Sequence, residues 1–518
     1  MMLNFEELIT KCDINSKKED FFMKLKRIVS LFLAFVMCLS LVALAGCGGD
    51  VEDLGTYTEE EVLGQENITN STETESTEIA SGTSSSASSS TGASASASTG
   101  GSTGGSTGGS GKAKAKVDAS ERAIFENIPD SLKGTTVKFG TWIDHRSTDY
   151  AHVLSDFEKL TGMKVELVSI TQADYVVKLT AMKASGTMPD IVVENGDFPR
   201  TLALIQPITE AVTGINPYDS FWEQSIVKKY TINNKVYAIN GANSNFVMPG
   251  ALCYYNIPLL KDHGIKSPND YIKENNWTLD TFLKCAQDAQ KAGLLGAHID
   301  VTVFSQVYGD GPMGYDFKTQ KYTNTMGTAK FQEVWKYLAT NREKGTFKLQ
   351  NSWATDLPNG RTAMTISGGY GLRKQPGWYY QMDPNDIGYA YLPKANKSDA
   401  SYPTSPLFRG YCIASGAKNP KGAGYFLRYF LNDDWYNDDD IWKDSRAAAM
   451  AAELTKMSSK IMKAPRDGLV LVQYADWKEF YLDLSTSTPD QVKTNIDKVS
   501  KKLDYCITKA NKLIDAAR

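Results

Sequence analysis

Hydrophobic and polar positions follow two alternating periods between residues 137 and 193. Residues 137–142, 164–170 and 191–193 form the short apolar runs that are typical of strands. Residues 150–160 and 174–184 carry apolar side chains at helical spacings of three and four. Strands that alternate with helices in this way predict a parallel sheet with helices on its faces.

The carboxyl ends of such strands are where an α/β sheet binds its ligand. The loop after the first predicted strand offers Trp142, Asp144 and Arg146, and the loop after the third offers Glu194 and Asp197. Each loop also has a structural interpretation. Asp144 and Arg146 would suit an exposed salt bridge, and Asp197 would suit a helix N-cap.

Three further helices have clear start signals. Thr278 is expected to cap a helix that runs to about Ala292, and Asn419-Pro420 starts another. The last helix is predicted to start at Thr488-Pro489 and to lie on the folded body through one apolar face. A partner-binding coiled coil is the alternative, but the stripe spans only about three heptads. The stripe consists of Val492, Ile496, Val499, Leu503, Ile507 and Ala510.

The N-terminal region has the layout of a secretory signal peptide, which we assign to residues 1–46. A basic segment at residues 24–27 precedes an apolar run at 28–42. The run ends in Leu44-Ala45-Gly46-Cys47, which resembles a bacterial lipobox with lipid attachment at Cys47. A transmembrane helix is the alternative, but the run is short for a hydrocarbon core of about 30 Å.

Composition divides the rest of the chain. Residues 1–22 carry more acids than bases, so we expect translation to start at Met23. Residues 47–117 become rich in Ser, Thr, Ala and Gly after the lipidated cysteine, and they predict a disordered tether. Residues 118–518 predict the folded body.

Charge and rare residues exclude several classes of protein. The 518 residues contain 56 Lys+Arg and 60 Asp+Glu, so the net charge of -4 argues against a nucleic-acid binder. Four His argue against a multi-histidine metal enzyme, and we expect no metal and no cofactor. The Asp-rich segment 433–440 lacks the spacing of a calcium loop and is interpreted as solvated. The following cysteines are expected to be buried free thiols: Cys253, Cys285, Cys412 and Cys506.

Four segments of the body occur in an order that resembles a known family. They resemble the extracellular solute-binding proteins of ABC transporters, in the maltose-binding-like family 1. The resemblance runs from about Thr135 to the C-terminus. The segments are Asp156–Val165, Gly186–Val192, Gly360–Ile366 and Ile387–Pro393.

The resemblance implies an α/β, two-lobed periplasmic-binding-protein-like fold with a hinge and an interlobe ligand cleft. Lobe one would comprise about 130–247 and 411–435, and lobe two about 250–408 and 440–518. It also implies a binder without enzymatic activity, which captures a carbohydrate, especially an oligosaccharide, and delivers it to the permease transmembrane subunits. The protein would be a monomer, held by its lipid on the outside of a Gram-positive cell membrane.

Three alternatives to carbohydrate import stay open. The acids of the presumed cleft would also suit a non-sugar polar or cationic solute. A surface glycoside hydrolase would also use aromatic and carboxylate side chains, although the chain has no local hydrolase motif. A tethered adhesin or sensor subunit could use the same fold.

Sugars are bound by aromatic faces and by planar polar groups, and the resemblance suggests which residues supply them. Glu194 stands where family members often have an aromatic residue, which departs from the maltose-binding pattern. Asp197 matches a ligand-binding Asp, and Tyr370 a stacking aromatic. The full set of candidate ligand contacts is Trp142, Asp144, Arg146, Glu194, Asp197, Asn243, Tyr370, Arg409, Tyr411 and Trp477.

Overall fold

A computed structural model describes most of the predicted body. The described residues are 117–517 without 149–150, 173, 195, 248, 350–355, 375–381, 408, 438–440 and 464–483. The predicted signal peptide, Cys47, nearly all of the tether and Trp477 therefore lie outside the described residues. Among those described, no helix combines the length and the apolar character needed to cross a membrane.

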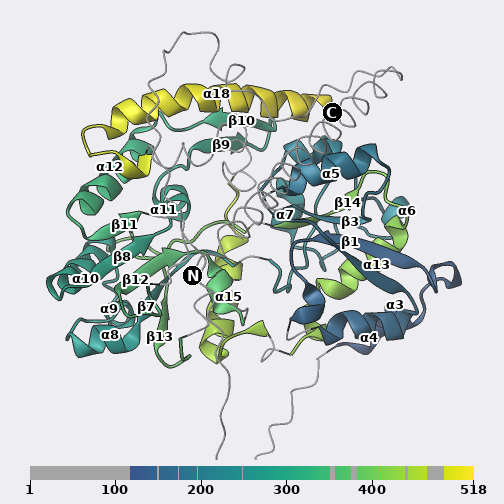
Figure 1. The fold of residues 1–518 in the computed structure, drawn as a ribbon, viewed down its shortest axis with the longest axis horizontal. Coiled ribbons are helices and arrows are strands. Elements are labelled where there is room, and N and C mark those ends of the chain that lie inside the picture. The colour runs from purple at the N-terminus through teal and green to yellow at the C-terminus, as the bar shows by residue number, and fades with distance from the viewer. Residues whose placement is uncertain are drawn as a thin grey trace, which may run out of the picture. The chain divides into compact units, whose positions relative to one another are not determined.

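The first sheet has five strands in the order β2-β1-β3-β14-β4 (Figure 1). Strand β1 pairs in parallel with both β2 and β3, which confirms the prediction for the first three strands. Strand β14 pairs antiparallel with β3 and β4, so the sheet is mixed and not purely parallel as predicted. The strands are β1 (Thr136–Thr141), β2 (Lys164–Ser169), β3 (Ile191–Glu194), β4 (Ile205–Gln206) and β14 (Gly410–Ala414).

Helices α4 (His152–Thr161), α5 (Tyr175–Ala184) and α13 (Pro420–Phe430) accompany this sheet and confirm the helical periodicity. Helix α4 ends at Gly162, whose φ of 70° suits the left-handed C-cap of a helix. Helix α13 begins after Asn419, whose side chain accepts the N–H of the third following residue at 3.0 Å. The predicted start signal at Asn419 therefore acts as a cap, and Gly162 caps the end of α4.

The second sheet also has five strands, in the order β11-β8-β12-β7-β13. Strand β12 pairs in parallel with β8 and antiparallel with β7, so this sheet is mixed as well. Helix α10 (Leu279–Lys291) packs against β8 and β12. The strands are β7 (Leu252–Asn256), β8 (Leu295–Ile299), β11 (Phe347–Leu349), β12 (Thr362–Ser367) and β13 (Ile387–Ala390).

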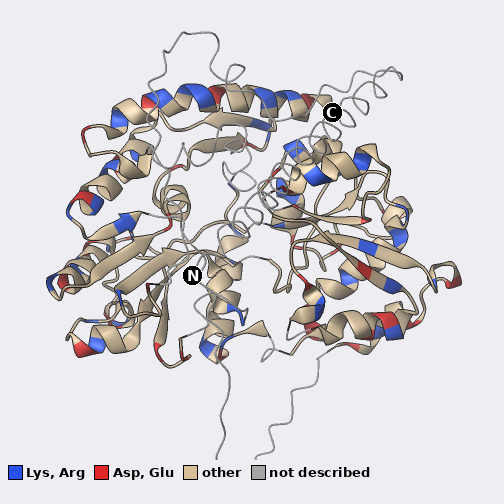
Figure 2. Cartoon of the chain, viewed as in Figure 1, with Lys and Arg blue, Asp and Glu red and all other residues tan. Residues whose placement is uncertain are grey.

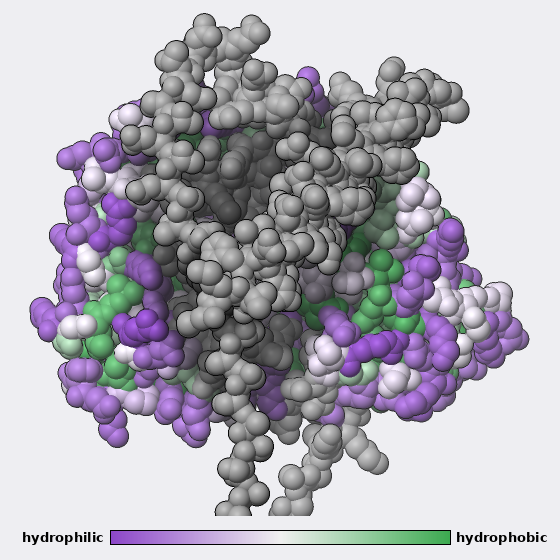
Figure 3. Space-filling model, in the orientation of Figure 1, coloured by the Kyte–Doolittle hydropathy of each residue, from purple (hydrophilic) through white to green (hydrophobic). Residues whose placement is uncertain are grey.

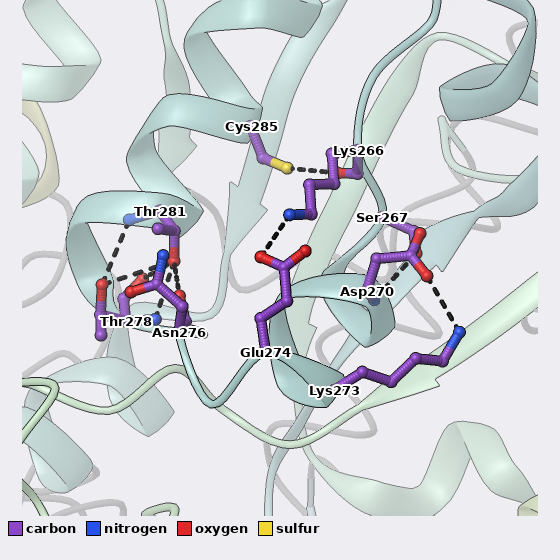
Figure 4. Close-up of polar contacts among 9 residues, drawn as sticks. All are labelled: Lys266, Ser267, Asp270, Lys273, Glu274, Asn276, Thr278, Thr281 and Cys285. Atoms are coloured by element: carbon purple, nitrogen blue, oxygen red, sulfur yellow. Dashed lines mark hydrogen bonds and ion pairs between the residues drawn. The ribbon is translucent and has the colours of Figure 1, made fainter.

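Two consecutive helices beside this sheet have side-chain caps (Figure 4). Ser267 accepts a backbone N–H from the first turn of α9 (Pro268–Lys273). Thr278 caps α10 (Leu279–Lys291), as predicted, and accepts the N–H of Thr281 at 3.3 Å. The Thr281 hydroxyl accepts the Thr278 N–H at 2.8 Å in return, which completes a capping box.

The C-terminal helix α18 (Val492–Ala516) packs on the hairpin β9 (Met313–Asp316) and β10 (Lys321–Asn324). The predicted apolar stripe is buried, which confirms that α18 lies on the body. The predicted start was three residues too early. The Thr488 carbonyl accepts the N–H groups of both the third and the fourth following residues, so the chain makes a turn before the helix begins.

The tip of the β9–β10 hairpin contacts a second turn. The Gln320 side chain donates to the carbonyl of Thr231 and accepts the N–H of Asn233, both at 3.1 Å. These partners belong to the short hairpin of β5 (Thr231–Ile232) and β6 (Lys235–Val236). The remaining elements are η1 (Asp130–Leu132), η2 (His145–Ser147), η3 (Arg200–Ala203), η4 (Gly369–Leu372), η6 (Asp433–Trp435), α3 (Ala119–Glu126), α6 (Glu210–Thr213), α7 (Gln224–Lys229), α8 (Ile257–Asp262), α11 (Val301–Tyr308), α12 (Ala329–Glu343) and α15 (Ser445–Ser458).

Both signs of charge are distributed over the described helices and loops (Figure 2). On the face seen in Figure 3, the described surface is mainly hydrophilic and carries small hydrophobic patches. All four predicted free cysteines are buried, as expected.

We predict that Gly424→Ala destabilises the protein by about 1–3 kcal/mol, as overpacking typically does. Gly424 lies where α13 packs against α6, and a methyl group there would overlap the carbonyl oxygen of Thr213. The free energy of urea-induced unfolding measures the effect. Gly327→Ala is the matched control, because a methyl group there would meet no atom within 4 Å. Equal stability losses in the two variants would contradict this packing argument.

Candidate functional site

Side chains from three distant segments meet at one edge of the first sheet. Trp142 follows the last residue of β1, and Glu194 is the last residue of β3. Gly410 pairs with Glu194 at the start of β14, so Arg409 enters at the same edge. The half-buried Trp142 ring lies 5.7 Å from the Arg409 guanidinium carbon. We call Trp142, Glu194, Asp197 and Arg409 the strand-edge site.

Tyr175 fixes the spacing of this edge. Its hydroxyl donates to the carbonyl of Gly140 on β1 at 2.7 Å and accepts the N–H of Val193 on β3 at 2.9 Å. Its ring meets Trp142 edge-on, with 5.2 Å between centroids. Tyr175 thus holds two strands and one candidate ligand contact in a fixed relation. Sequence reasoning missed it, because its position at a helix start has the periodicity of an ordinary core residue.

Glu194 is buried and its carboxylate is used by its own loop. One oxygen accepts the N–H groups of Gly196 at 2.5 Å and Asp197 at 2.9 Å, and the other accepts the Thr201 hydroxyl at 3.2 Å. Burial, and then repulsion from Asp197, raise the pKa of Glu194 to about 7. Glu194 therefore shapes the loop that holds Asp197. It also belongs to β3 itself, and not to the following loop as predicted.

Arg409 has a left-handed backbone, with a φ of 78°, which few non-glycine residues adopt. Its carbonyl accepts an amide N–H of Asn240 at 3.1 Å, which helps to hold this conformation. The buried His145 lies near both Arg409 and Arg373. Burial, and then these two arginines, lower the pKa of His145 to about 3, so the imidazole is neutral at physiological pH.

The loop after β1 directs its other two candidates elsewhere. The Arg146 guanidinium binds the Glu158 carboxylate and the Val165 carbonyl, both at 2.7 Å. Asp144 is exposed, and its carboxylate accepts the backbone N–H of Arg146 at 3.1 Å. The alternative of an Asp144–Arg146 salt bridge is therefore wrong, because Glu158 on α4 provides the carboxylate for Arg146. The structure brings neither residue to the strand-edge site.

Two other candidates take up packing or surface positions. The Tyr411 ring is buried among aromatic residues, including Phe139 and Phe430, so it belongs to the core. Asn243 is exposed, and its amide donates to the Asn432 side chain at 3.3 Å. Asn243 lines a cavity of about 390 Å³ that none of the other candidate residues lines.

Tyr370 lies in η4, after β12 of the second sheet, and its hydroxyl hydrogen-bonds the Ser367 hydroxyl at 2.8 Å. Two glycines, which permit a close approach of the backbone, precede Tyr370. A methyl group on Gly369 would overlap Pro249 and Gly250, so the close approach is to the chain's own segment. Tyr370 is half-buried, and its role as a stacking aromatic stays a prediction.

The acidic residues do not gather as a metal site would require. Within the described ranges, no group of three or more His, Cys, Asp or Glu side chains is placed to hold an ion. The interpretation of residues 433–440 as solvated is wrong for Asp433, which is half-buried. Its carboxylate accepts both the backbone and the side-chain N–H of Asn245, at 2.5 and 2.7 Å. Asp197 does not cap η3 either, because that position is Pro199.

Solved structures share this fold at low sequence identity. The galacto-N-biose/lacto-N-biose I-binding protein of an ABC transporter from Bifidobacterium longum gives a TM-score of 0.56, with 12% identity over 74% of this chain and 99% of its own. The GacH receptor of Streptomyces glaucescens gives 0.51, with 16% identity over 71% and 98%. The MalE domain of Bdellovibrio bacteriovorus gives 0.51, with 13% identity over 71% and 99%. No curated protein matches the chain.

These likenesses confirm the predicted fold class, an α/β protein of the two-lobed periplasmic-binding type. The family model described as bacterial extracellular solute-binding protein matches residues 152–459. The chain belongs to this family, and its place of action is therefore outside the cytoplasm.

We predict that the free energy of unfolding of the wild type falls as the pH rises from 5 to 8, and that Glu194→Gln reduces this fall by at least about 1 kcal/mol. The folded-state pKa of Glu194 lies above its ordinary value of 4.5. Its contribution to stability is therefore complete below pH 4.5 and is lost as the pH rises towards 7. Urea unfolding at several pH values measures how the free energy of unfolding changes with pH.

The matched control for this titration is Glu166→Gln, which changes an exposed glutamate on the neighbouring strand β2. This control should keep the wild-type slope. A Glu194→Gln variant with the wild-type slope would show that Glu194 does not titrate in this range.

Proposed function

We propose that the protein is the solute receptor of an ABC importer and that its solute is a carbohydrate, in particular an oligosaccharide. The observation that carries this proposal is the half-buried Trp142 at the carboxyl end of β1, beside the guanidinium of Arg409. An indole face stacks on the C–H side of a sugar ring, while a planar guanidinium donates to neighbouring hydroxyl groups. The receptor binds and releases its solute without chemistry.

The solutes of similarly folded proteins agree with this proposal. The Bifidobacterium longum protein was solved in complex with lacto-N-biose, and the Bdellovibrio bacteriovorus domain with maltotriose. The GacH receptor was solved with acarbose. The three proteins share the fold of this chain, and each bound a saccharide or a saccharide analogue.

Glu194 is poorly placed to bind a cationic solute. Such a solute needs an available carboxylate, but both oxygens of Glu194 already accept hydrogen bonds from the chain's own loop. A ligand that competed for them would have to open that loop.

We predict that at least one oligosaccharide raises the melting temperature of the full chain, because a ligand that binds only the folded state stabilises it by mass action. A thermal-shift panel of plant and host oligosaccharides, with amino acids and polyamines as controls, measures this. Trp142→Ala should lower the affinity for the best ligand by about tenfold, the value expected for the loss of one aromatic stacking contact.

Tyr218→Ala is the control for this substitution, since Tyr218 is an aromatic residue that is 60% exposed and lies outside the strand-edge site. It should bind like the wild type. Shifts with amino acids or polyamines alone would refute the carbohydrate assignment and leave the solute-binding family unaffected.

We also propose that a lipid on Cys47 anchors the monomeric receptor to the outer face of a Gram-positive cell membrane, near its permease subunits. The support is the order of the basic segment, the apolar run and the Leu-Ala-Gly-Cys sequence that ends it. A disordered tether after Cys47 would let the body reach solutes beyond the membrane surface.

We predict that Cys47→Ala abolishes incorporation of labelled palmitate and releases the protein into the culture medium. Cys38→Ala is the matched control, because Cys38 lies within the apolar run and should leave labelling unchanged. Continued labelling of Cys47→Ala would place the lipid elsewhere or exclude the anchor.

A further inference from the structure

Arg373 is a buried cation with few partners. It follows η4 and is only 4% exposed. One guanidinium N–H lies 3.5 Å from the carbonyl of Val247, and its Nε has no hydrogen-bond partner. Arg373 forms no ion pair with a carboxylate of the described residues. A buried charge in this state is costly, because neither water nor a counter-charge stabilises it.

Another arginine of the same protein shows the contrast. The Arg428 guanidinium lies 4.6 Å from the ring centroid of Phe221 and also pairs with the carboxylates of Glu121 and Asp219. The Arg373 guanidinium has the aromatic partner, Phe246 at 5.7 Å, but no carboxylate partner in the part of the chain that the structure describes. Arg428 therefore shows that an aromatic-stacked arginine in this fold can also have carboxylate partners, which Arg373 lacks among the described residues.

The backbone and the aromatic partner of Arg373 are both held in place. The N–H of Lys374 donates to Ile441 at 2.8 Å, and the N–H of Lys443 donates to Leu372 at 3.1 Å, so the chain is pinned on both sides of Arg373. Phe246 stacks on the core residue Phe430 with 4.4 Å between centroids. The guanidinium is therefore preorganised, so ligand binding would cost little conformational entropy at this side chain.

Arg373 lies near the strand-edge site. Arg373 and Arg409 both act electrostatically on the buried His145, which stays neutral and therefore adds no charge of its own. Arg409 in turn belongs to the strand-edge site. His145 thus relates Arg373 to the residues that we propose to bind the solute.

We infer that Arg373 binds an anionic group of the solute, and therefore that the solute is an acidic saccharide. This inference rests on the proposed carbohydrate function. A guanidinium presents two parallel N–H groups that match the two oxygens of a carboxylate, and it pairs equally well with a sulfate or phosphate ester. The anion would supply the counter-charge that the described residues do not.

The test compares acidic oligosaccharides with their neutral, carboxyl-reduced counterparts on the full chain by calorimetry. The probes are oligogalacturonates, alginate disaccharides and glucuronate-bearing xylan fragments, with a sulfated heparin disaccharide as a separate arm. Carboxyl reduction should weaken binding by about 10- to 100-fold, the value for one charged hydrogen-bonded pair. Preference for the sulfated disaccharide would assign an ester and not a carboxylate as the anion.

Variants test whether Arg373 causes the preference for acidic over carboxyl-reduced saccharides. Arg373→Gln should remove the preference for acidic over reduced saccharides, whereas Arg373→Lys should retain part of it. Arg361→Gln is the matched control, because this arginine is 69% exposed and should leave the preference unchanged. If Arg373→Gln does not fold, as judged by its thermal transition, two measurements still test the inference. They are the affinities of the wild type for acidic and reduced saccharides, and the same comparison for Arg373→Lys.

Two negative results separate the inference from the proposed function. Equal binding of acidic and reduced saccharides, unchanged by Arg373→Gln, would overturn the inference and leave the carbohydrate proposal intact. The absence of binding by every saccharide, acidic or neutral, would overturn the proposed function and the inference with it.

Discussion

The candidate site depends on the antiparallel pairing of β14 with β3. The chain leaves the first sheet after β4, forms the whole second sheet, and returns to pair Gly410 with Glu194. This pairing brings Arg409 to the edge where Trp142 already lies against Tyr175. No local segment could form the arrangement alone, so the site exists only once β14 has joined the first sheet. Ligand binding is consequently coupled to the stability of the whole body.

Two buried ionisable groups near this edge differ in the number of hydrogen-bond partners that the protein gives them. The oxygens of Glu194 accept hydrogen bonds from N–H and hydroxyl donors of its own loop, and burial raises its pKa to about 7, which disfavours its charged form. The Arg373 guanidinium has an aromatic surface and one distant carbonyl. A group that is already satisfied gains little from a ligand, whereas an unsatisfied one gains much. This difference favours Arg373 over Glu194 as the charged contact of the solute.

The sequence predicted the local features of the fold well. The caps Thr278 and Asn419 and the apolar stripe of α18 lie where periodicity and start signals placed them, because these signals act within one or two turns of a helix. The direction of β14 could not be predicted, since it depends on a partner strand from a distant part of the chain.

The same limit applies to the candidate site. The sequence singled out the loop after β1, but it could not show that Glu158 engages Arg146 or that Tyr411 faces the core. Arg373 has no motif of its own. Its importance follows from burial and from missing partners, and only the packed structure shows either.

The four cysteines of the described body bear on where the protein works. All are free and buried, and burial raises the pKa of each thiol. The thiolate is the species that reacts with oxidants and disulfides, so these side chains are poorly reactive. Within the described body, burial therefore keeps these four thiols protonated and out of reach of extracellular oxidants.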